Sequence, residues 1–351
     1  MEFLICMNPL EDELNLRILR YLVSGQGVKV NISALARNLE IHRATVKRRV
    51  EKLYKNKILN EPQYPFPQLF QEYPLLILVK ADMPRTQNAK EFYKNESNIF
   101  AAFSCMEGSY NTLLIEFFED LESYHRWREQ IIKDQKIPSR FSRTPAHVDI
   151  FSNKLTFKYE PNCYVKDMKK EFEKNDSLTI SDQSLDEASF NILENLTKGE
   201  CIRTNDSFIA RELGSNRKTI KRRIENLLDK GIIDQPKCYF PNLFIPPGYN
   251  LVVSMIAVKS REDDIKKYLQ VDNHVSRAIE TSTERYNILL FSAFQTIEDF
   301  FAWGENLNSK FPDCIGAISK TILSSRMIHT INPQKVSLGW IERKLWEIKQ
   351  R

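Results

Sequence analysis

The side chains whose type and spacing best suit a chemical task are basic, and they occur in two short segments. The first segment, Thr45-Val-Lys-Arg-Arg-Val-Glu-Lys-Leu53, recurs as Thr219-Ile-Lys-Arg-Arg-Ile-Glu-Asn-Leu227 at an offset of 174 residues. Lys and Arg neutralise phosphates, and Arg can also donate two hydrogen bonds to the major-groove edge of guanine. The two segments therefore indicate two copies of one element that binds a polyanion.

Each basic segment has the apolar period of a helix with one buried face, which in the first copy consists of Val46, Val50 and Leu53. The candidate DNA contacts lie on the opposite face or at the helix start. They are His42, Arg43, Thr45, Lys47, Arg48 and Lys52 in the first copy, and Asn216, Arg217, Lys218, Thr219, Lys221 and Arg222 in the second.

Three of the polar residues in these segments suit two roles equally well. Asn216 can read a base or cap its helix, because Asn is a favourable N-cap residue. Arg49 and Arg223 lie at the border between the two helix faces, so each suits a structural or a phosphate contact. The sequence leaves these alternatives open.

The residues before each basic helix predict a helix-turn-helix motif. Ala36 and Val46 are ten positions apart with a three-residue turn between them, and Ala210 and Ile220 repeat this spacing. In such a motif the second helix enters the major groove of DNA. The apolar pairs at 58–59 and 232–233, each followed by a proline, predict a short wing strand after each motif.

The rest of each copy predicts a β-α-β-β-α-β domain of the ferredoxin-like type. The elements are expected at 75–80, 89–95, 100–107, 110–118, 121–132 and 146–151, and again at 251–259, 265–269, 275–281, 286–292, 297–308 and 318–325. The fold class is therefore α+β, with two copies of a winged helix-turn-helix followed by a ferredoxin-like domain. We expect self-association through the ferredoxin-like sheets.

The expected boundaries follow from the repeat and from shifts in composition. A charged, Ser-rich stretch without an apolar period predicts a linker at 166–184. A C-terminal amphipathic helix is expected to dock on its own domain or on a second molecule. The complete set is 1–62, 63–165, 166–184, 185–236, 237–335 and 336–351.

Other chemistry finds little support in the sequence. The six cysteines contain no CxxC pair, the five histidines show no paired spacing, and no glycine-rich phosphate loop or nucleophile elbow occurs. We therefore expect no enzyme, no cofactor and no bound metal. The spread-out cysteines and the lack of a long apolar run predict a cytoplasmic protein that does not enter a membrane. The net charge of +5 over 351 residues is by itself weak evidence for a polyanionic partner.

The sequence resembles the leucine-responsive regulator (Lrp/AsnC) family over nearly its whole length, twice. The resemblance rests on residues 32–46, on Leu228-Asp-Lys-Gly-Ile-Ile233 and on Glu107-Gly-Ser-Tyr-Asn111, which is similar to the family's Gly-x-Tyr-Asp hairpin. Glu40 departs from the family's turn glycine, which Gly214 retains. The resemblance implies a transcription regulator whose tandem chain forms a covalent pseudo-dimer, with an assembly domain and a small-molecule effector that the sequence does not identify.

We therefore expect sequence-specific binding to double-stranded DNA by two recognition helices in successive major grooves. Because Arg43-Ala-Thr45 and Arg217-Lys-Thr219 differ, the two half-sites should be unequal. Two alternatives remain. Siroheme decarboxylases resemble this fold on paired subunits, which favours an enzyme, and the motifs could instead form a scaffold that binds proteins.

Overall fold

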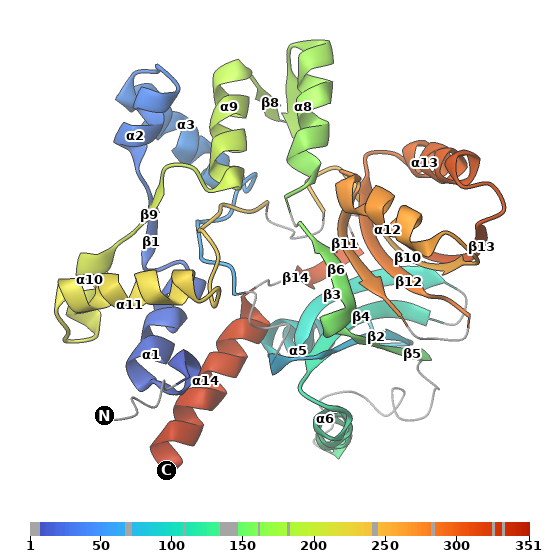
Figure 1. The fold of residues 1–351 in the computed structure, drawn as a ribbon, viewed down its shortest axis with the longest axis horizontal. Helices are drawn as coiled ribbons and strands as arrows, with labels where there is room; N and C mark the ends of the chain where they lie inside the picture. The colour runs from blue at the N-terminus through green and yellow to red at the C-terminus, as the bar shows by residue number, and fades with distance from the viewer. Residues whose placement is uncertain are drawn as a thin grey trace. The chain divides into compact units, whose positions relative to one another are not determined.

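The computed structural model describes residues 8–66, 72–107, 110–133, 147–160, 162–180, 183–240, 245–281, 285–324, 327–331 and 334–351. They form two compact units built from separate stretches of chain (Figure 1). The helical unit takes 1–69, 188–239 and 333–351, and the sheet unit takes 70–187 and 240–332. Positions 108–109 of the expected hairpin motif lie outside the described residues.

The helical unit contains the two expected sets of three helices. They are α1 (Glu13–Val23), α2 (Ile32–Asn38) and α3 (Arg43–Lys55), and later α9 (Glu187–Lys198), α10 (Asp206–Glu212) and α11 (Arg217–Asp229). Polar side chains set the helix starts: Asp12 accepts a hydrogen bond from the amide of Asn15, and Asn31 accepts one from Ala34. The turn before each basic helix has a positive φ, 54° at Glu40 and 58° at Gly214.

Strands β1 (Val28–Val30) and β9 (Ile202–Thr204) form a two-stranded antiparallel ribbon that joins the two sets. Hydrogen bonds at both ends extend it. The amide of Asn31 donates to the carbonyl of Cys201 (2.7 Å), and the amide of Asn205 donates to that of Gly27 (2.8 Å). Since 31 and 205, like 27 and 201, differ by 174, the ribbon relates the two sets by an approximate twofold.

The expected wing strands do not form at 58–59 and 232–233, where the chain makes buried turns. The following residues bond across the repeat instead. The amide of Asn60 donates to the carbonyl of Tyr239 (2.6 Å), and Gln63 and Lys237 form an antiparallel bridge. The prediction of a wing was wrong because these backbone groups find their partners in the other copy and not in a local hairpin.

The expected C-terminal helix is α14 (Lys335–Gln350), and it packs against α1 within the helical unit. Arg20 Nε lies 2.8 Å from a carboxylate oxygen of Glu342. Trp340 is fully buried, with its ring 5.5 Å from that of Phe66. Within the helical unit, the helix therefore docks on the first helix of the first helix-turn-helix set.

The sheet unit holds two five-stranded antiparallel sheets, in the orders β14-β3-β4-β2-β5 and β13-β10-β12-β11-β6. In each sheet, four neighbouring strands come from one copy and follow the ferredoxin-like order. The strands are β2 (Leu75–Ala81), β3 (Ile99–Glu107), β4 (Tyr110–Phe118) and β5 (His147–Ser152), then β10 (Asn250–Val258), β11 (Val275–Glu280), β12 (Ile288–Phe294) and β13 (Ile315–Ser324). The accompanying helices are α5 (Gln87–Asn95), α6 (Leu121–Lys133), α12 (Glu262–Val271) and α13 (Ile297–Lys310).

The fifth strand of each sheet comes from the other half of the chain. Strand β6 (Thr156–Tyr159) follows β5 but pairs with β11, and β14 (Ile328–Ile331) follows β13 but pairs with β3. The expected association between ferredoxin-like sheets therefore takes place inside one chain, through exchanged edge strands. This pairing also covers edges that would otherwise expose unpaired backbone groups.

The segment expected to be a linker, 166–184, is structured. It forms most of α8 (Tyr164–Asn175) and the hairpin of β7 (Leu178–Ile180) and β8 (Gln183–Leu185). Most of its charged residues are exposed, although Asp167 and Glu171 are half-buried, and Met168, Leu178 and Ile180 are buried. The prediction was wrong because an apolar stripe this short gives little periodic signal. None of the described helices is long and apolar enough to cross a membrane.

Candidate nucleic-acid interface and ligand cavities

The basic helices α3 and α11 have the same burial pattern at equivalent positions. Val46, Val50 and Leu53 are buried in α3, and their equivalents Ile220, Ile224 and Leu227 are buried in α11. The remaining faces point to solvent. Of the expected DNA contacts, Thr45 and Thr219 are half-buried, and the exposed ones are His42, Arg43, Lys47, Arg48, Lys52, Asn216, Arg217, Lys218, Lys221 and Arg222.

The residues that precede both helices act as N-caps. Asn216 Oδ1 accepts a hydrogen bond from the amide of Lys218 (2.8 Å), and His42 Nδ1 accepts one from Ala44 (3.4 Å). Of the two roles open to Asn216 the structure displays capping. The other side chains of the first turn, Arg43, Arg217 and Lys218, are exposed.

Carboxylates on the same or the preceding helix accompany some of these cations. Lys47 lies 3.8 Å from Glu51, Lys221 lies 3.7 Å from Glu225, and Arg217 lies 3.9 Å from Asp206. The basic side chains of these pairs are more than 60% exposed, so each pair contributes little energy. Such weak pairs leave the cations available to an anionic partner.

Arg49 and Arg223 make structural contacts that join the two copies. Arg49 Nη1 donates to Ser189 Oγ (2.5 Å) at the start of α9. Arg223 Nη1 donates to Asp12 (2.8 Å) and to Asn15 (2.7 Å) at the start of α1. Because Asn15 and Ser189 also differ by 174, each basic helix is anchored to the first helix of the other copy in the same way.

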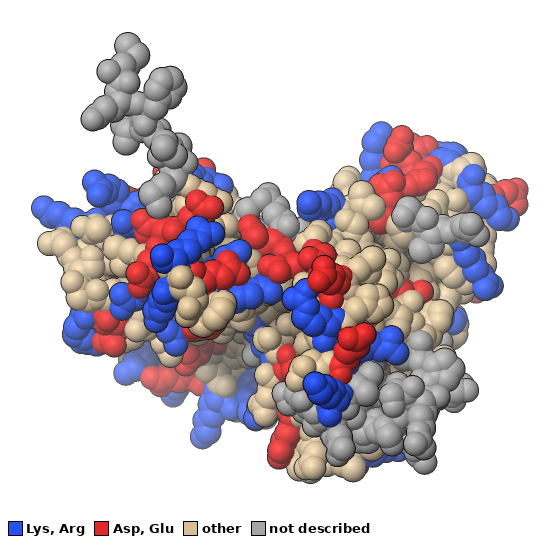
Figure 2. Space-filling model, turned by 90° about the horizontal axis from the view of Figure 1, so that it is seen from below, with Lys and Arg blue, Asp and Glu red and all other residues tan. Residues whose placement is uncertain are grey.

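The face of the protein drawn in Figure 2 carries mixed charge. On the face in Figure 2, Lys and Arg side chains alternate with Asp and Glu and form no single continuous basic surface. This agrees with the modest net charge of +5. Attraction to a polyanion must therefore depend on a few placed side chains rather than on total charge.

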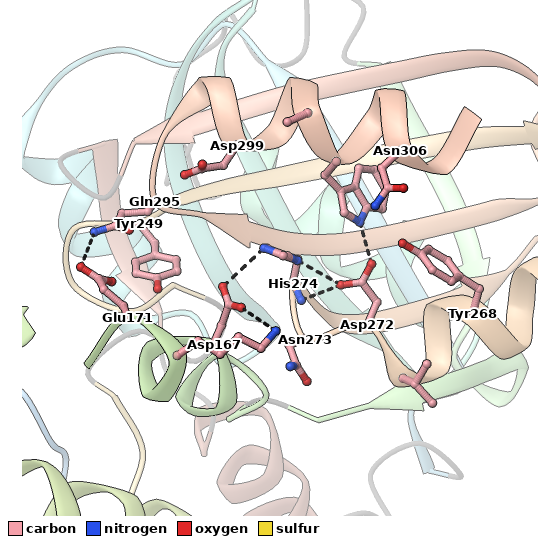
Figure 3. Close-up of a pocket in the computed structure, with 14 residues that line it drawn as sticks. Asp167, Glu171, Tyr249, Tyr268, Asp272, Asn273, His274, Gln295, Asp299 and Asn306 are labelled. Atoms are coloured by element: carbon pink, nitrogen blue, oxygen red, sulfur yellow. Dashed lines mark hydrogen bonds and ion pairs between the residues drawn. The ribbon is translucent and has the colours of Figure 1, made fainter. Parts of the chain in front are cut away.

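A cavity of about 560 Å³ lies in the sheet unit between α8, α13 and the loop after α12 (Figure 3). Its lining carries four carboxylates, from Asp167, Glu171, Asp272 and Asp299, against the cation of Lys170. This balance disfavours an anionic ligand, because like charges in a partly buried site repel.

The imidazole of His274 is fixed in this cavity between two carboxylates. Its Nδ1 lies 3.1 Å from Asp272 and its Nε2 lies 3.4 Å from Asp167. Burial lowers the pKa of His274, but the hydrogen bond to Asp272 and the charge of Asp167 outweigh it and raise the pKa above its ordinary value. Trp303 Nε1 donates to Asp272 (2.6 Å), so Asp272 links the loop to α13.

A second cavity in the sheet unit, of about 290 Å³, has the opposite electrostatic character. It lies between the residues after β2, helix α5 and the exchanged strand β14, and its described lining includes Arg85 and Lys90 but no Asp or Glu. His329 Nε2 lies 2.9 Å from Ser104 Oγ, and burial together with Lys90 lowers the pKa of His329. The cavity suits a small anionic group such as a carboxylate.

Apart from Asn111, which belongs to the expected hairpin motif and lines the second cavity, the sequence analysis did not single out the residues of either cavity. His329 is brought to Ser104 only by the exchanged strand, and the sequence gives no signal for that exchange. In the chain as described, no group of three or more His, Cys, Asp or Glu side chains is placed to hold a metal ion.

The chain matches no family model, and no curated protein matches its sequence. Among solved structures it is similar to the siroheme decarboxylase NirDL, with 12% identity, 96% of this chain and 100% of that chain covered, and a TM-score of 0.51. The same enzyme in complex with an iron-uroporphyrin III analogue matches with a TM-score of 0.50. At this identity the match shows a shared fold over nearly the full length.

Parts of the chain also align with single-copy regulators. A transcriptional regulator from Neisseria meningitidis in complex with L-Met has 14% identity, 40% of this chain and 88% of that chain covered, and a TM-score of 0.28. AsnC from E. coli has 16% identity, with 40% and 90% covered and a TM-score of 0.27. The expected full-length resemblance to Lrp/AsnC regulators thus reduces to partial alignments.

The full-length match also corrects the expectation that the chain is not an enzyme. That expectation rested on the absence of familiar catalytic motifs, yet a protein with the same fold over its whole length is a decarboxylase. A search for catalytic motifs cannot detect an enzyme that lacks them. The chemistry of this chain therefore has to be argued from its own side chains.

Proposed function

We propose that the helical unit binds double-stranded DNA with α3 and α11, and that the chain regulates transcription. One observation carries the proposal: two basic helices expose equivalent faces and are anchored to each other's motif by equivalent contacts of Arg49 and Arg223. A helix pair related by a twofold matches the local twofold of duplex DNA, whose successive major grooves lie about 34 Å apart.

In each basic helix we assign base contacts to the first turn and phosphate contacts to the residues after it. Arg43 and Arg217, in the first turn, would read bases, since the N-terminal residues of a recognition helix contact base edges. Lys47, Arg48, Lys52, Lys221 and Arg222 supply phosphate contacts. Position 44 is Ala but position 218 is Lys, so we propose unequal half-sites within one chain that acts as a pseudo-dimer.

The test is DNA binding by the full chain, measured by fluorescence anisotropy with random-sequence duplex at two salt concentrations. We expect salt-sensitive binding that is lost in the variant Lys47→Ala/Arg48→Ala/Lys221→Ala/Arg222→Ala. The matched control removes four exposed lysines of the sheet unit, with the variant Lys94→Ala/Lys154→Ala/Lys174→Ala/Lys267→Ala. Equal loss in both variants, or no binding by the native chain at low salt, would refute the proposal.

A second candidate is decarboxylation of a carboxylate-bearing tetrapyrrole, favoured by the full-length match to siroheme decarboxylase and by the basic cavity. Arg85 and Lys90 would pair with one carboxylate of the substrate beside His329. A volume of about 290 Å³ is at the lower limit for ligand pockets, so this cavity would hold one substituent rather than a whole macrocycle.

Siroheme titration tests the second candidate. Binding should shift the Soret band and release of carbon dioxide should follow, and Arg85→Gln/Lys90→Gln should weaken both at least tenfold. The control, Lys94→Gln/Lys267→Gln, removes two exposed cations elsewhere on the sheet unit. No spectral shift with the native chain, or equal effects of the two double variants, would exclude this role for the cavity.

A further inference from the structure

The ribbon that joins the two helix-turn-helix sets carries two cations directly opposite each other. In the antiparallel register of β1 and β9, Lys29 faces Arg203, at equivalent positions of the two copies. Both side chains are exposed, while Val28 is buried and Val30 and Ile202 are half-buried. The ribbon therefore has an apolar inner face and a doubly charged outer face.

This arrangement opposes folding of the isolated chain. Side chains of directly opposed residues in an antiparallel pair lie close together, and like charges there are destabilising. Among the residues that the structure describes, neither Lys29 nor Arg203 is paired with a carboxylate. A bound anion would relieve this repulsion, because it would pair with both cations.

The position of the ribbon identifies the anion. Lys29 lies three residues before the start of α2, and Arg203 lies three residues before the start of α10. Within each three-helix set, α2 and α10 are the first of the two helices of the helix-turn-helix motif. In helix-turn-helix complexes this helix crosses the DNA backbone. Since the ribbon lies on the approximate twofold between the motifs, its outer cations are placed to meet backbone between the two half-sites.

We propose that Lys29 and Arg203 form a third DNA contact, to the phosphates at the centre of the site. The inference rests on the proposed DNA binding by α3 and α11 and adds a contact that belongs to neither recognition helix. Because the pair contacts phosphates only, it contributes affinity without sequence preference at the centre of the site.

The test compares the salt dependence of DNA affinity of the full chain with that of Lys29→Gln/Arg203→Gln. Each neutralised phosphate contributes about 0.9 to the slope of log K against log salt, so the double variant should lower the slope by about 1.8. The control, Lys174→Gln/Lys267→Gln, removes two exposed lysines of the sheet unit and should keep the native slope. A native slope in the ribbon variant would overturn the inference.

A second readout needs no DNA. Removal of an uncompensated repulsion should leave the melting temperature of the ribbon variant equal to or above that of the native chain. In Lys29→Glu a carboxylate faces Arg203, so we expect a higher melting temperature together with weaker DNA binding than in Lys29→Gln. A lower melting temperature in these variants would show that the pair stabilises the chain without DNA, contrary to the inference.

The failure of this inference can be told apart from that of the proposed function. If the native chain binds no duplex, both fail. If the native chain binds duplex, the four-residue variant of α3 and α11 does not, and Lys29→Gln/Arg203→Gln keeps the native slope, then only the ribbon contact is excluded.

Discussion

At the scale of single residues, Arg49 and Arg223 occupy equivalent positions and both anchor a basic helix to the other copy, but they bind different acceptor groups. Arg49 donates to a serine hydroxyl, while Arg223 donates to a carboxylate and an amide. Sequence reasoning placed both arginines at the border of the buried face but left their role open. The role depends on partners 140 and 208 residues away in the chain, which helical periodicity does not reveal.

A buried carboxyl group distinguishes the first sheet. Glu116 is fully buried on β4 between Ile77 and Ile99 of the neighbouring strands, and neither of its oxygens has a hydrogen-bond partner among the described residues. Burial, with a smaller contribution from the charge of Glu96, raises the pKa of Glu116 to about 8. The folded chain therefore holds this group as the neutral acid at neutral pH.

Glu116 should make the stability of the chain fall with rising pH. The unfolded chain ionises this group near its ordinary value of 4.5, whereas the folded chain keeps the proton until about 8, so stability is lost between these values. At about 1.4 kcal/mol per pKa unit, the loss is on the order of 5 kcal/mol. Denaturant unfolding of Glu116→Gln should show greater stability than native at pH 8.5 and a smaller difference at pH 5.

The control for Glu116→Gln is Glu129→Gln, which changes an exposed carboxyl group on α6. It should leave the pH dependence of unfolding as in the native chain. An identical pH profile for Glu116→Gln and the native chain would mean that Glu116 is not protonated in the folded state at neutral pH.

His274 should have the same sign of pH dependence, for a different reason. Its folded pKa lies above the ordinary value, so its contribution to stability is present in acid and is lost as the pH rises through the folded pKa. The melting temperature of His274→Asn should therefore fall further below native at pH 5.5 than at pH 9. His125→Asn, on the exposed surface of α6, is the control, and equal differences at both pH values would contradict the assignment.

At the scale of elements, the sequence predicted what depends on local periodicity. The basic helices, the strands of both sheets and the C-terminal helix lie within a few residues of their expected bounds. The wings and the linker were wrong, and the ribbon and the exchanged strands were not foreseen. Except for the linker, each of these depends on pairing between chain segments more than a hundred residues apart, which no local pattern encodes.

The close contact between Gly199, just after α9, and the backbone of Pro236 gives a prediction at the scale of elements. Gly199 has a φ of 87°, and a Cβ there would lie 2.2 Å from the carbonyl oxygen of Pro236. Gly231, with a φ of 65°, has open space around its added Cβ. Ala at 231 should cost only the strain of positive φ, about 1 kcal/mol. Gly199→Ala should cost about 1 to 3 kcal/mol more because the backbone must move.

Chemical denaturation of the two glycine variants makes the comparison directly. Equal losses of unfolding free energy would show that the carbonyl of Pro236 does not constrain position 199. Gly25, whose added Cβ would lie 2.9 Å from the carbonyl oxygen of Pro62, should give an intermediate loss when replaced by Ala.

At the scale of the whole molecule, the fold similarity and the exposed basic helices support different proposals. The full-length similarity is to a decarboxylase, while the exposed basic helices of this chain favour a DNA-binding protein. Fold alone does not decide between them, because function depends on the side chains at the site. The sequence could predict the candidate DNA contacts because they share one helix face. It could not predict a role for Lys29, Arg203 and most cavity residues, because segments far apart in the chain bring these residues together.

The most direct test of the central claim is footprinting of the chain on a duplex selected from a random library, with the native chain, Arg43→Ala and Arg217→Ala. We predict two protected major-groove segments about one helical turn apart, with each variant losing about 1 to 3 kcal/mol of discrimination in a different segment. A single protected segment, or loss in the same segment with both variants, would contradict the account of two unequal readers in one chain.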